Sequence, residues 1–258
     1  MHFLCCLFVL ALFYCTIITV SAEDPFTTHS FDGGNSQTLP YRQLSPETMT
    51  PGKRYPLVIF LHGAGERGSD NDKQLKNVAR IFSEDANRKA FPCFVIAPQC
   101  PEGKRWCEVD WSDAKPHKTP EQPSDPMKLL LKLIDQLRQQ PNIDHARLYV
   151  MGLSMGGFGT WDLVTRRPGQ FAAAIPICGG GDVEAAPQLN KLPLWLFHGD
   201  QDTVVKTVRS QLMVEALKKA GSTVVRYTEY PGVAHNSWTP ASKEAELLPW
   251  LFEQHRAQ

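Results

Sequence analysis

Short apolar runs alternate with amphipathic segments along most of the chain. Most runs are continuously apolar, which is typical of parallel strands that are covered on both faces. They lie at residues 57–61, 94–97, 147–151, 172–177, 194–197 and 223–230, and we expect one or two earlier strands within residues 38–44. Because such strands alternate with helical segments, the pattern predicts an α/β fold with a mostly parallel sheet.

Amphipathic segments between and after these runs carry apolar residues at helical spacing. The apolar positions are Leu75, Val78, Ala79 and Phe82 in the first, Leu130, Leu133, Ile134 and Leu137 in the second, and Val208, Leu212, Ala216 and Leu217 in the third. Gly221 stands where the third helix should end. A last helix is expected over residues 241–254, with a bend at Pro249.

Residues 98–126 interrupt this rhythm. They contain six prolines, two tryptophans and two cysteines and show no period. A loop this long usually has a function, and this one leaves the carboxyl end of a strand, where open α/β sheets place ligands. Trp106 and Trp111 in the loop, together with Trp238, are therefore candidates to bind substrate by stacking on a sugar or an aromatic acyl group. The alternative is that they pack the loop against the body of the protein.

The amino-terminal segment differs from the rest of the chain. Residues 3–20 are apolar apart from two threonines and carry no charge, and small residues follow at positions 21 and 22. We expect a secretory signal peptide over residues 1–22 and a single domain over residues 23–258. The protein would then be secreted or periplasmic, without stable membrane insertion after cleavage. An uncleaved membrane anchor is the alternative.

The remaining composition is that of a globular protein, with 42% hydrophobic and 21% charged residues. Lys+Arg and Asp+Glu are equal at 27 each and no basic block occurs, so nucleic acid is not an expected partner. Cys93, Cys100, Cys107 and Cys178 follow the signal segment, and four cysteines allow three full pairings. A disulfide bond between Cys100 and Cys107 is preferred, and free buried thiols are the alternative.

The first chemical motif is the sequence Gly152-Leu153-Ser154-Met155-Gly156, which fits a nucleophile elbow. Such a serine sits on a strained turn between a strand and a helix, so that its Oγ stands clear of the backbone. A predicted strand precedes Ser154, and residues 157–167 have a helical pattern that ends at a Pro-Gly pair. This setting favours Ser154 as a nucleophile over a simple glycine-rich turn.

A nucleophile of this kind needs an acid and then a histidine further along the chain. Asp200 and Asp202 both follow the predicted strand at 194–197, and we choose Asp202 as the acid. The other role for Asp200 is to hold the turn, and Asp182 also has the setting of a turn residue. His235 follows the last predicted strand and is the candidate base, which an aspartate would orient. His255 lies three residues from the carboxyl terminus and is expected to be solvated.

A glycine-rich loop, residues 62–68, follows the predicted strand at 57–61. In a hydrolase this loop supplies one backbone N–H to an oxyanion, and the residue after the nucleophile supplies the other. We assign these donors to Ala64 and Met155. For Glu66 and Arg67 we expect an ion pair beside the loop rather than contacts with substrate.

The same loop also spells G-x-G-x-x-G, the fingerprint of dinucleotide-binding oxidoreductases. That fingerprint needs a helix that starts inside the motif, but polar residues 69–72 intervene here. It also needs an acidic residue at the end of the next strand, whereas Glu84 and Asp85 lie in a helical pattern. The oxidoreductase is therefore the weaker hypothesis.

The four motifs together resemble a family of secreted α/β hydrolases, described as phospholipase/carboxylesterase-like, dienelactone-hydrolase-like or prolyl-oligopeptidase-like predicted peptidases. The motifs are residues 61–68, 152–157, 198–202 and 232–235, and the resemblance spans residues 39–252. It implies an α/β-hydrolase fold with about eight mostly parallel strands. It also supports Asp202 over Asp200 and the oxyanion donors Ala64 and Met155.

The expected function is that of a serine carboxylic-ester hydrolase with a Ser-His-Asp acyl-enzyme mechanism. No metal and no cofactor is needed. The expected substrate is a small-molecule or carbohydrate-linked ester, such as an acyl or feruloyl ester. A serine peptidase of the prolyl-oligopeptidase-like type is the alternative, made less favourable because the chain has no propeller domain of the kind that restricts true oligopeptidases.

Overall fold

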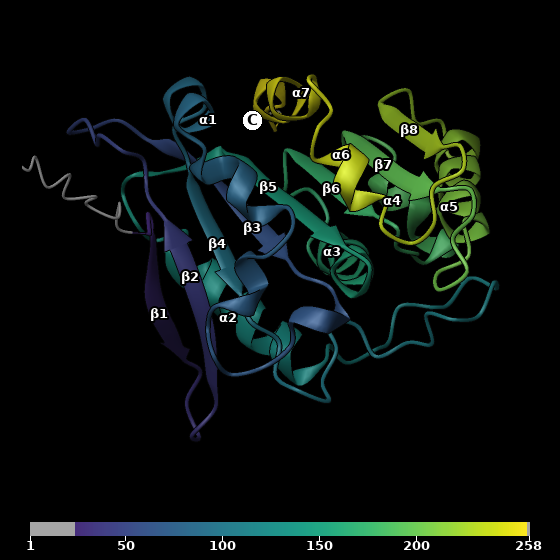
Figure 1. The fold of residues 1–258 in the computed structure, drawn as a ribbon, viewed down its shortest axis with the longest axis horizontal. Helices are drawn as coiled ribbons and strands as arrows, with labels where there is room; N and C mark the ends of the chain where they lie inside the picture. Colours follow the sequence, from purple (N-terminus) through teal and green to yellow (C-terminus); the bar gives the residue numbers. More distant parts are fainter. Residues whose placement is uncertain (1–23, 257–258) are drawn as a thin grey trace, which may run out of the picture.

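A computed structural model describes residues 24–256. The proposed signal peptide lies outside the described residues. Eight strands form one sheet with the order β1-β2-β4-β3-β5-β6-β7-β8 (Figure 1). The strands are β1 (Phe26–Asp32), β2 (Thr38–Leu44), β3 (Tyr55–Leu61), β4 (Phe94–Pro98), β5 (Ile143–Leu153), β6 (Ala173–Ile177), β7 (Leu194–Gly199) and β8 (Val225–Tyr230).

The sheet is parallel from β4 through β8, and the β1–β2 hairpin extends it in antiparallel fashion. This confirms the predicted α/β-hydrolase architecture with eight mostly parallel strands. Strand β1 escaped prediction because it is an edge strand whose residues are mostly exposed and polar. The six later strands overlap the predicted runs. β3, β4, β6 and β7 are buried throughout because helices cover both faces of the sheet, whereas the edge strand β8 is only partly buried.

Seven α-helices occur within residues 24–256. They are α1 (Asp85–Ala90), α2 (Asp125–Leu137), α3 (Met155–Arg166), α4 (Ala186–Leu189), α5 (Val208–Lys219), α6 (Trp238–Ala241) and α7 (Leu247–Glu253). Short 3₁₀ helices occur at η1 (Ala64–Glu66), η2 (Lys73–Leu75), η3 (Ala79–Ser83) and η4 (Val183–Ala185).

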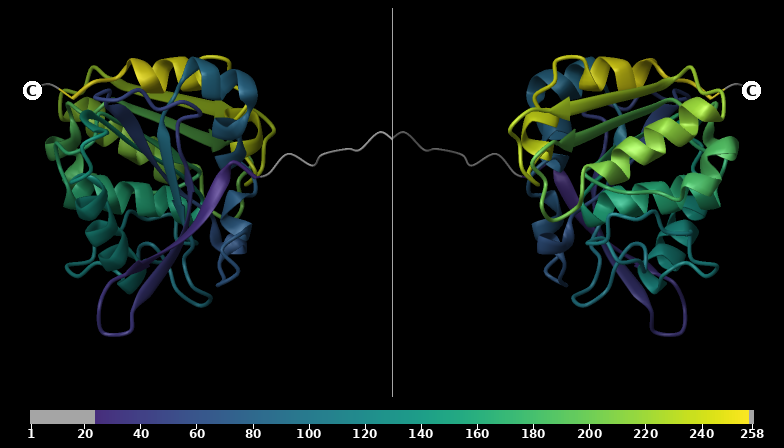
Figure 2. Two further views of the ribbon diagram at one scale, coloured as in Figure 1. Left: turned by 90° about the vertical axis from the view of Figure 1, so that its left-hand side faces the viewer. Right: turned by 90° about the vertical axis from the view of Figure 1, so that its right-hand side faces the viewer.

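The helices form two layers around the sheet (Figure 2). Successive side chains of a strand point to opposite faces. On β3, Leu57 and Ile59 pack in the core that α2, α3 and α5 cover, while Val58 and Phe60 pack in the core that η3 and α7 cover. Because the strands from β4 through β8 are parallel, their carboxyl ends lie at one edge of the sheet, and the loops that follow them meet there.

Two of the predicted helices are wrong in detail. The segment from Leu75 to Phe82 forms η2 and η3, because Asn77 between them adopts a left-handed backbone with φ of 64°. The last helix, expected over residues 241–254, covers only Leu247–Glu253 as α7, and the short α6 precedes it. Pro249 lies in the first turn of α7, where proline is tolerated, so it does not bend a longer helix. The helices predicted around Leu133 and Leu212 are confirmed as α2 and α5.

The preferred disulfide bond between Cys100 and Cys107 is also wrong. Cys93, Cys100, Cys107 and Cys178 are all buried free thiols. Cys100 packs in the main core, whereas Cys107 packs beside Phe158 in a separate small cluster and its Sγ lies 3.7 Å from Asp162 Oδ1. No helix within residues 24–256 has both the length and the apolar character needed to cross a bilayer.

Candidate active site

Ser154 occupies a sharp turn between β5 and α3. Its backbone has φ of 53° and ψ of −119°, a region that a residue with a Cβ rarely adopts. The turn persists because its surroundings determine it: the Ser154 N–H donates to the Ile177 carbonyl on β6 at 2.9 Å. The side chain is only partly buried, so its Oγ can be reached from outside.

The two flanking glycines of this turn are explained by close backbone contacts. A Cβ on Gly152 would lie 2.3 Å from the Gly156 carbonyl oxygen, and a Cβ on Gly156 would lie 2.0 Å from the Leu61 carbonyl oxygen. Both distances are far below van der Waals contact. Glycine is therefore required at these positions for the turn to pack against β3.

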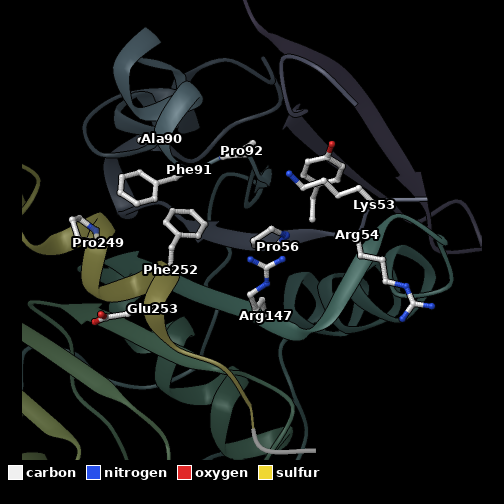
Figure 3. Close-up of a pocket in the computed structure, with 11 residues that line it drawn as sticks. Lys53, Arg54, Pro56, Ala90, Phe91, Pro92, Arg147, Pro249, Phe252 and Glu253 are labelled. Carbon is white, nitrogen blue, oxygen red and sulfur yellow. The ribbon is translucent and has the colours of Figure 1, made fainter. Parts of the chain in front are cut away.

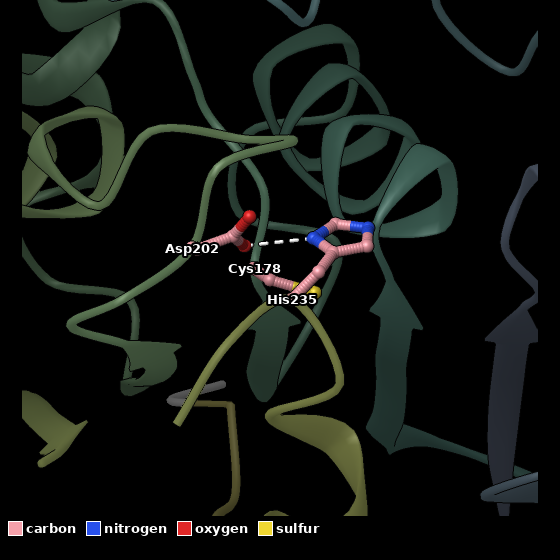
Figure 4. A group of neighbouring side chains, drawn as sticks. All are labelled: Cys178, Asp202 and His235. Carbon is pink, nitrogen blue, oxygen red and sulfur yellow. Dashed lines mark hydrogen bonds and ion pairs between the residues drawn. The ribbon is translucent and has the colours of Figure 1, made fainter. Parts of the chain in front are cut away.

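Ser154, His235 and Asp202 form one chain of hydrogen bonds. Ser154 Oγ lies 2.9 Å from His235 Nε2. His235 Nδ1 lies 2.7 Å from Asp202 Oδ2, and Figure 4 shows this second hydrogen bond. A carboxylate can only accept, so Nδ1 carries the hydrogen and Nε2 is free to accept from the serine. The residues follow β5, β7 and β8, so the parallel sheet brings their loops together. The structure thus joins the three residues that the sequence analysis chose.

Three hydrogen bonds and one further close contact hold the Asp202 carboxylate. Its Oδ1 accepts the backbone N–H groups of Val204 and Val205, both at 2.9 Å. Its Oδ2 faces His235 Nδ1 and, at 3.2 Å, Nε2 of the buried His198. Burial by itself would raise the pKa of Asp202, but the hydrogen bonds from His198, His235 and the backbone outweigh it and hold the pKa well below the usual value. Asp202 is therefore an anion at neutral pH.

The two other aspartates hold turns. Asp200 Oδ1 accepts the Gly232 N–H at 2.7 Å and joins the turns that follow β7 and β8. Asp182 accepts the N–H groups of Glu184 and Thr119, at 3.0 and 2.8 Å, and so caps η4 and anchors the long loop. Both have the structural role that the sequence analysis gave as their alternative.

Cys178 lies beside Asp202 and His235, and one donor atom from each residue falls within 4.8 Å of the others (Figure 4). A metal ion here would need a cysteine thiolate. Burial raises the pKa of the Cys178 thiol to about 12, so it stays protonated at neutral pH. His235 Nδ1 is already bonded to Asp202. These three residues therefore fit a hydrogen-bonded protein site better than a metal centre.

The glycine-rich loop lies against the serine. A Cβ on Gly63 would be 3.6 Å from Ser154 Cβ. Ala64 is the first residue of η1 and Met155 is the first residue of α3. The first N–H groups of a helix have no partner within that helix. Two such amides, from the loop beside Ser154 and from the residue after it, can together receive a developing negative charge.

His62 supports this loop, and the sequence analysis did not single it out. Its Nδ1 donates to the Gly63 carbonyl at 2.6 Å, and its Nε2 accepts the Cys100 N–H at 2.9 Å. Trp106 Nε1 donates to the His62 carbonyl at 3.2 Å. His62 therefore ties the glycine-rich loop to the start of the long loop. Its place directly after a buried strand and before the glycines is the sequence signal that could have found it.

Burial lowers the pKa of His62 to about 4. In the unfolded chain this histidine takes up a proton near pH 6.5. We therefore expect the contribution of His62 to the free energy of unfolding to be complete above pH 6.5 and to fall by about 3 kcal/mol between pH 6.5 and pH 4. Urea denaturation at several pH values measures this slope.

His62→Gln removes the titration, so this variant should show a flatter profile over that range. Burial and the nearby Arg209 also lower the pKa of His117 to about 4, so part of the slope should remain. His255→Gln, at an exposed position, is the matched control and should keep the wild-type slope. If the free energy of unfolding changed equally with pH in wild type and in His62→Gln, the titration of His62 would not be its cause.

The three tryptophans lie in different settings. Trp106 is completely buried against His62, so it packs the loop to the body and is not available to substrate. Trp111 is partly buried, and the Arg105 guanidinium lies 4.2 Å from its ring centre. Trp238 begins α6. Its ring lies edge-on to the His235 ring, with 5.4 Å between the ring centroids. Of the three, only Trp238 directly adjoins the candidate base.

The expected ion pair between Glu66 and Arg67 is not formed among the described residues. Arg67 Nε instead donates to the Ala64 carbonyl at 2.9 Å, which braces the loop. Glu66 Oε1 accepts from the Asn77 side chain at 3.2 Å. Burial raises the pKa of Glu66, whose carboxylate folds back toward Gly63.

A hollow of about 430 Å³ lies away from this site, near the amino-terminal end of β3 (Figure 3). Stacked Phe91 and Phe252 form part of its wall, and Lys53, Arg54 and Arg147 add positive charge. None of the residues that line it belongs to the Ser154 site. It is therefore separate from the site described above.

The dinucleotide-binding alternative also loses its structural basis. No α-helix begins between Gly63 and Gly68, where only η1 is found, and α1 does not start until Asp85. A pyrophosphate needs the N-terminus of a helix at the glycines. The loop instead packs beside Ser154.

Comparisons with known proteins agree with this geometry. A solved thermostable esterase matches with a TM-score of 0.82 and 40% identity, covering 90% of this chain and 64% of that one. Acyl-protein thioesterase 1 of Debaryomyces hansenii is 25% identical over 217 residues, which are 78% of this chain and 92% of the relative. The bifunctional acetylxylan esterase/xylanase XynS20E of Neocallimastix patriciarum is 25% identical over 162 residues, 62% of this chain and 21% of that protein.

The chain thus spans less than two thirds of the solved esterase and about a fifth of the acetylxylan esterase/xylanase. A family model described as phospholipase/carboxylesterase matches residues 48–245, which include Ser154, Asp202 and His235. The chain belongs to the phospholipase/carboxylesterase family of α/β hydrolases.

Proposed function

We propose that the protein is a serine carboxylic-ester hydrolase in which Ser154 is the nucleophile, His235 the general base and Asp202 the residue that orients the histidine. The observation that carries this proposal is the continuous hydrogen-bonded chain from Ser154 Oγ through His235 to Asp202, at 2.9 and 2.7 Å. The strained turn at Ser154 supports it, because strain of this kind is maintained mainly at functional sites.

In the first step, His235 Nε2 takes the hydroxyl proton as Ser154 Oγ bonds to the ester carbonyl carbon. The amides of Ala64 and Met155 stabilise the negative charge on the carbonyl oxygen. The imidazolium then protonates the leaving alcohol, and the C–O bond to that alcohol breaks. Asp202 stabilises the imidazolium while it exists.

In the second step, water attacks the acyl-enzyme, and His235 receives the proton of the water. The carbonyl–Oγ bond breaks, Ser154 regains its proton from His235, and the acid is released. This scheme uses only side chains and backbone groups of the chain. His235 is 20% exposed in its side chain, so it can serve both the alcohol and the water.

For the substrate, we propose a small-molecule or carbohydrate-linked ester, with an acetyl or feruloyl group as the acyl part. The acetylxylan esterase/xylanase among the relatives supports a carbohydrate-linked ester. Trp238 beside His235 supports it as well, because a tryptophan ring can stack on a sugar or an aromatic acid. We also propose that a signal peptide over residues 1–22 directs the catalytic domain to a secreted or periplasmic location.

Labelling with a fluorophosphonate probe tests the nucleophile. The probe should form a bond to Ser154 Oγ, and peptide mass mapping should place the label on that residue. His235→Gln should slow labelling strongly, because the base that removes the serine proton is lost. Labelling at another serine, or at an unchanged rate in His235→Gln, would contradict the proposed roles.

Substrates that differ only in the bond to be broken separate the remaining possibilities. We expect a higher kcat/KM for an oxygen ester than for the thioester or the amide of the same acyl group. A faster thioester would favour an activity like that in the name of the thioesterase relative. A faster amide would favour the peptidase alternative. Either result would overturn the ester proposal without affecting the role of Ser154.

A further inference from the structure

A second imidazole faces the same oxygen of Asp202 that His235 uses. His198 lies on β7 and is completely buried. Its Nε2 is 3.2 Å from Asp202 Oδ2, and His235 Nδ1 is 2.7 Å from that atom. The aspartate therefore lies between two histidines, one partly exposed beside the serine and one enclosed in the core.

The neighbours of His198 fix where its hydrogen lies. Nε2 faces two acceptors, Asp202 Oδ2 and the Val205 carbonyl at 2.9 Å, so it must carry a hydrogen. Nδ1 lies 2.7 Å from Ser210 Oγ, which is itself 3.2 Å from the Gly179 carbonyl. In a neutral ring Ser210 donates to Nδ1, and in a charged ring Nδ1 donates to Ser210, which then donates to Gly179. In both states the N–H on Nε2 faces the Val205 carbonyl and, at the longer distance of 3.2 Å, Asp202 Oδ2.

Few charged groups compete for this contact. Asp202 is the carboxylate that the His198 ring meets, and His235 and Cys178 are the other titratable groups around that carboxylate. Arg209 is next to Ser210 in the chain, but its guanidinium contacts His117 and the Asp113 carbonyl. The N–H on His198 Nε2 thus lies 3.2 Å from the charged Oδ2 of Asp202, the oxygen that also bonds His235.

We propose that His198 is a positioning residue that holds the Asp202 carboxylate toward His235 and sets the basicity of His235. This inference rests on the proposed function of the Ser154 site. An N–H on Oδ2 withdraws part of the negative charge that would otherwise face His235. Without it, Asp202 Oδ2 keeps only its bond to His235, and the charge that remains stabilises the imidazolium form of His235 more strongly.

Two substitutions at His198 test the idea. His198→Leu removes the N–H, and we expect kcat to fall by about tenfold, the effect of losing one hydrogen bond to a charged group, with little change in KM. The pKa on the acid side of the kcat/KM profile should move upward. His198→Gln places an amide N–H near the former Nε2 and should return that pKa toward the wild-type value and recover part of kcat.

Asp200→Asn is the matched control, since Asp200 lies on the same turn but bonds only to Gly232 N–H. Its pH profile should match that of wild type. The proton NMR signal of the His235 Nδ1–H should shift in His198→Leu and return in His198→Gln. If His198→Leu does not fold, Ser210→Ala loosens the ring from its Nδ1 side and should shift the pKa in the same direction by a smaller amount.

An unchanged pH profile and NMR signal in a folded His198→Leu protein would overturn the positioning role. So would a loss of activity that follows only the loss of folded protein, with Gln giving no recovery. The proposed function is tested separately, because a wild-type rate in Ser154→Ala would refute it whatever the His198 variants do.

Discussion

Replacing Ser154 with alanine should lower kcat for a short p-nitrophenyl ester by a factor on the order of 10⁵ or more. The change removes the atom that would form the acyl-enzyme and leaves Asp202 and His235 in place. The fold should persist, since the turn is held by the Ser154 backbone N–H on Ile177 rather than by the hydroxyl. Steady-state kinetics and a thermal melt, measured on the same preparation, check both statements.

Ser69→Ala, at an exposed serine of the loop that follows the oxyanion segment, is the matched control and should keep full activity. The residual rate of Ser154→Ala should also show no pre-steady-state burst of p-nitrophenol. A variant that still hydrolyses the ester at more than a few per cent of the wild-type rate would exclude Ser154 as the nucleophile.

Gly156→Ala should be one of the most disruptive single substitutions in this protein. The new Cβ would lie 2.0 Å from the Leu61 carbonyl oxygen and 2.8 Å from the His62 carbonyl oxygen, so two backbones would have to move apart. Overpacking typically costs 1–3 kcal/mol, and we expect a loss of at least about 3 kcal/mol here because both contacts are with backbone. Urea denaturation measures it.

The sign of this effect is informative, because alanine favours a helix over glycine by about 1 kcal/mol and Gly156 lies in α3. Gly65→Ala, where a Cβ meets no atom within 4 Å, is the control and should leave the free energy of unfolding nearly unchanged. A Gly156→Ala protein as stable as wild type would mean that α3 and β3 pack less closely than described.

The sequence pattern predicted the sheet well where the strands are buried on both faces. β3 and β5 carry continuous apolar runs because helices cover both of their sides. It failed where burial was weak, as in β1, or where one residue changed the backbone direction, as Asn77 does between η2 and η3. Apolar spacing records which face is buried, but not whether the backbone between the apolar positions stays helical.

The sequence by itself determined which chemistry was available. The order of a serine, an acid and a histidine, each after its own strand, selected Ser154, His235 and one of Asp200 and Asp202, because parallel strands bring their carboxyl ends to one edge. The choice of Asp202 over Asp200 came from the motif as a whole. Sequence alone did not give the tautomer of His235. That tautomer follows from the structure, because Nδ1 is the ring nitrogen that faces the Asp202 carboxylate.

The tertiary structure decided which side chains support these residues. Trp106 and His62 are 44 positions apart, and no local pattern encodes their contact. For the same reason, Cys100 and Cys107 pack in different clusters despite their short separation, and Trp106 is buried rather than exposed to substrate. Local spacing fixes the elements, whereas sheet order and side-chain packing fix the partners of each polar atom.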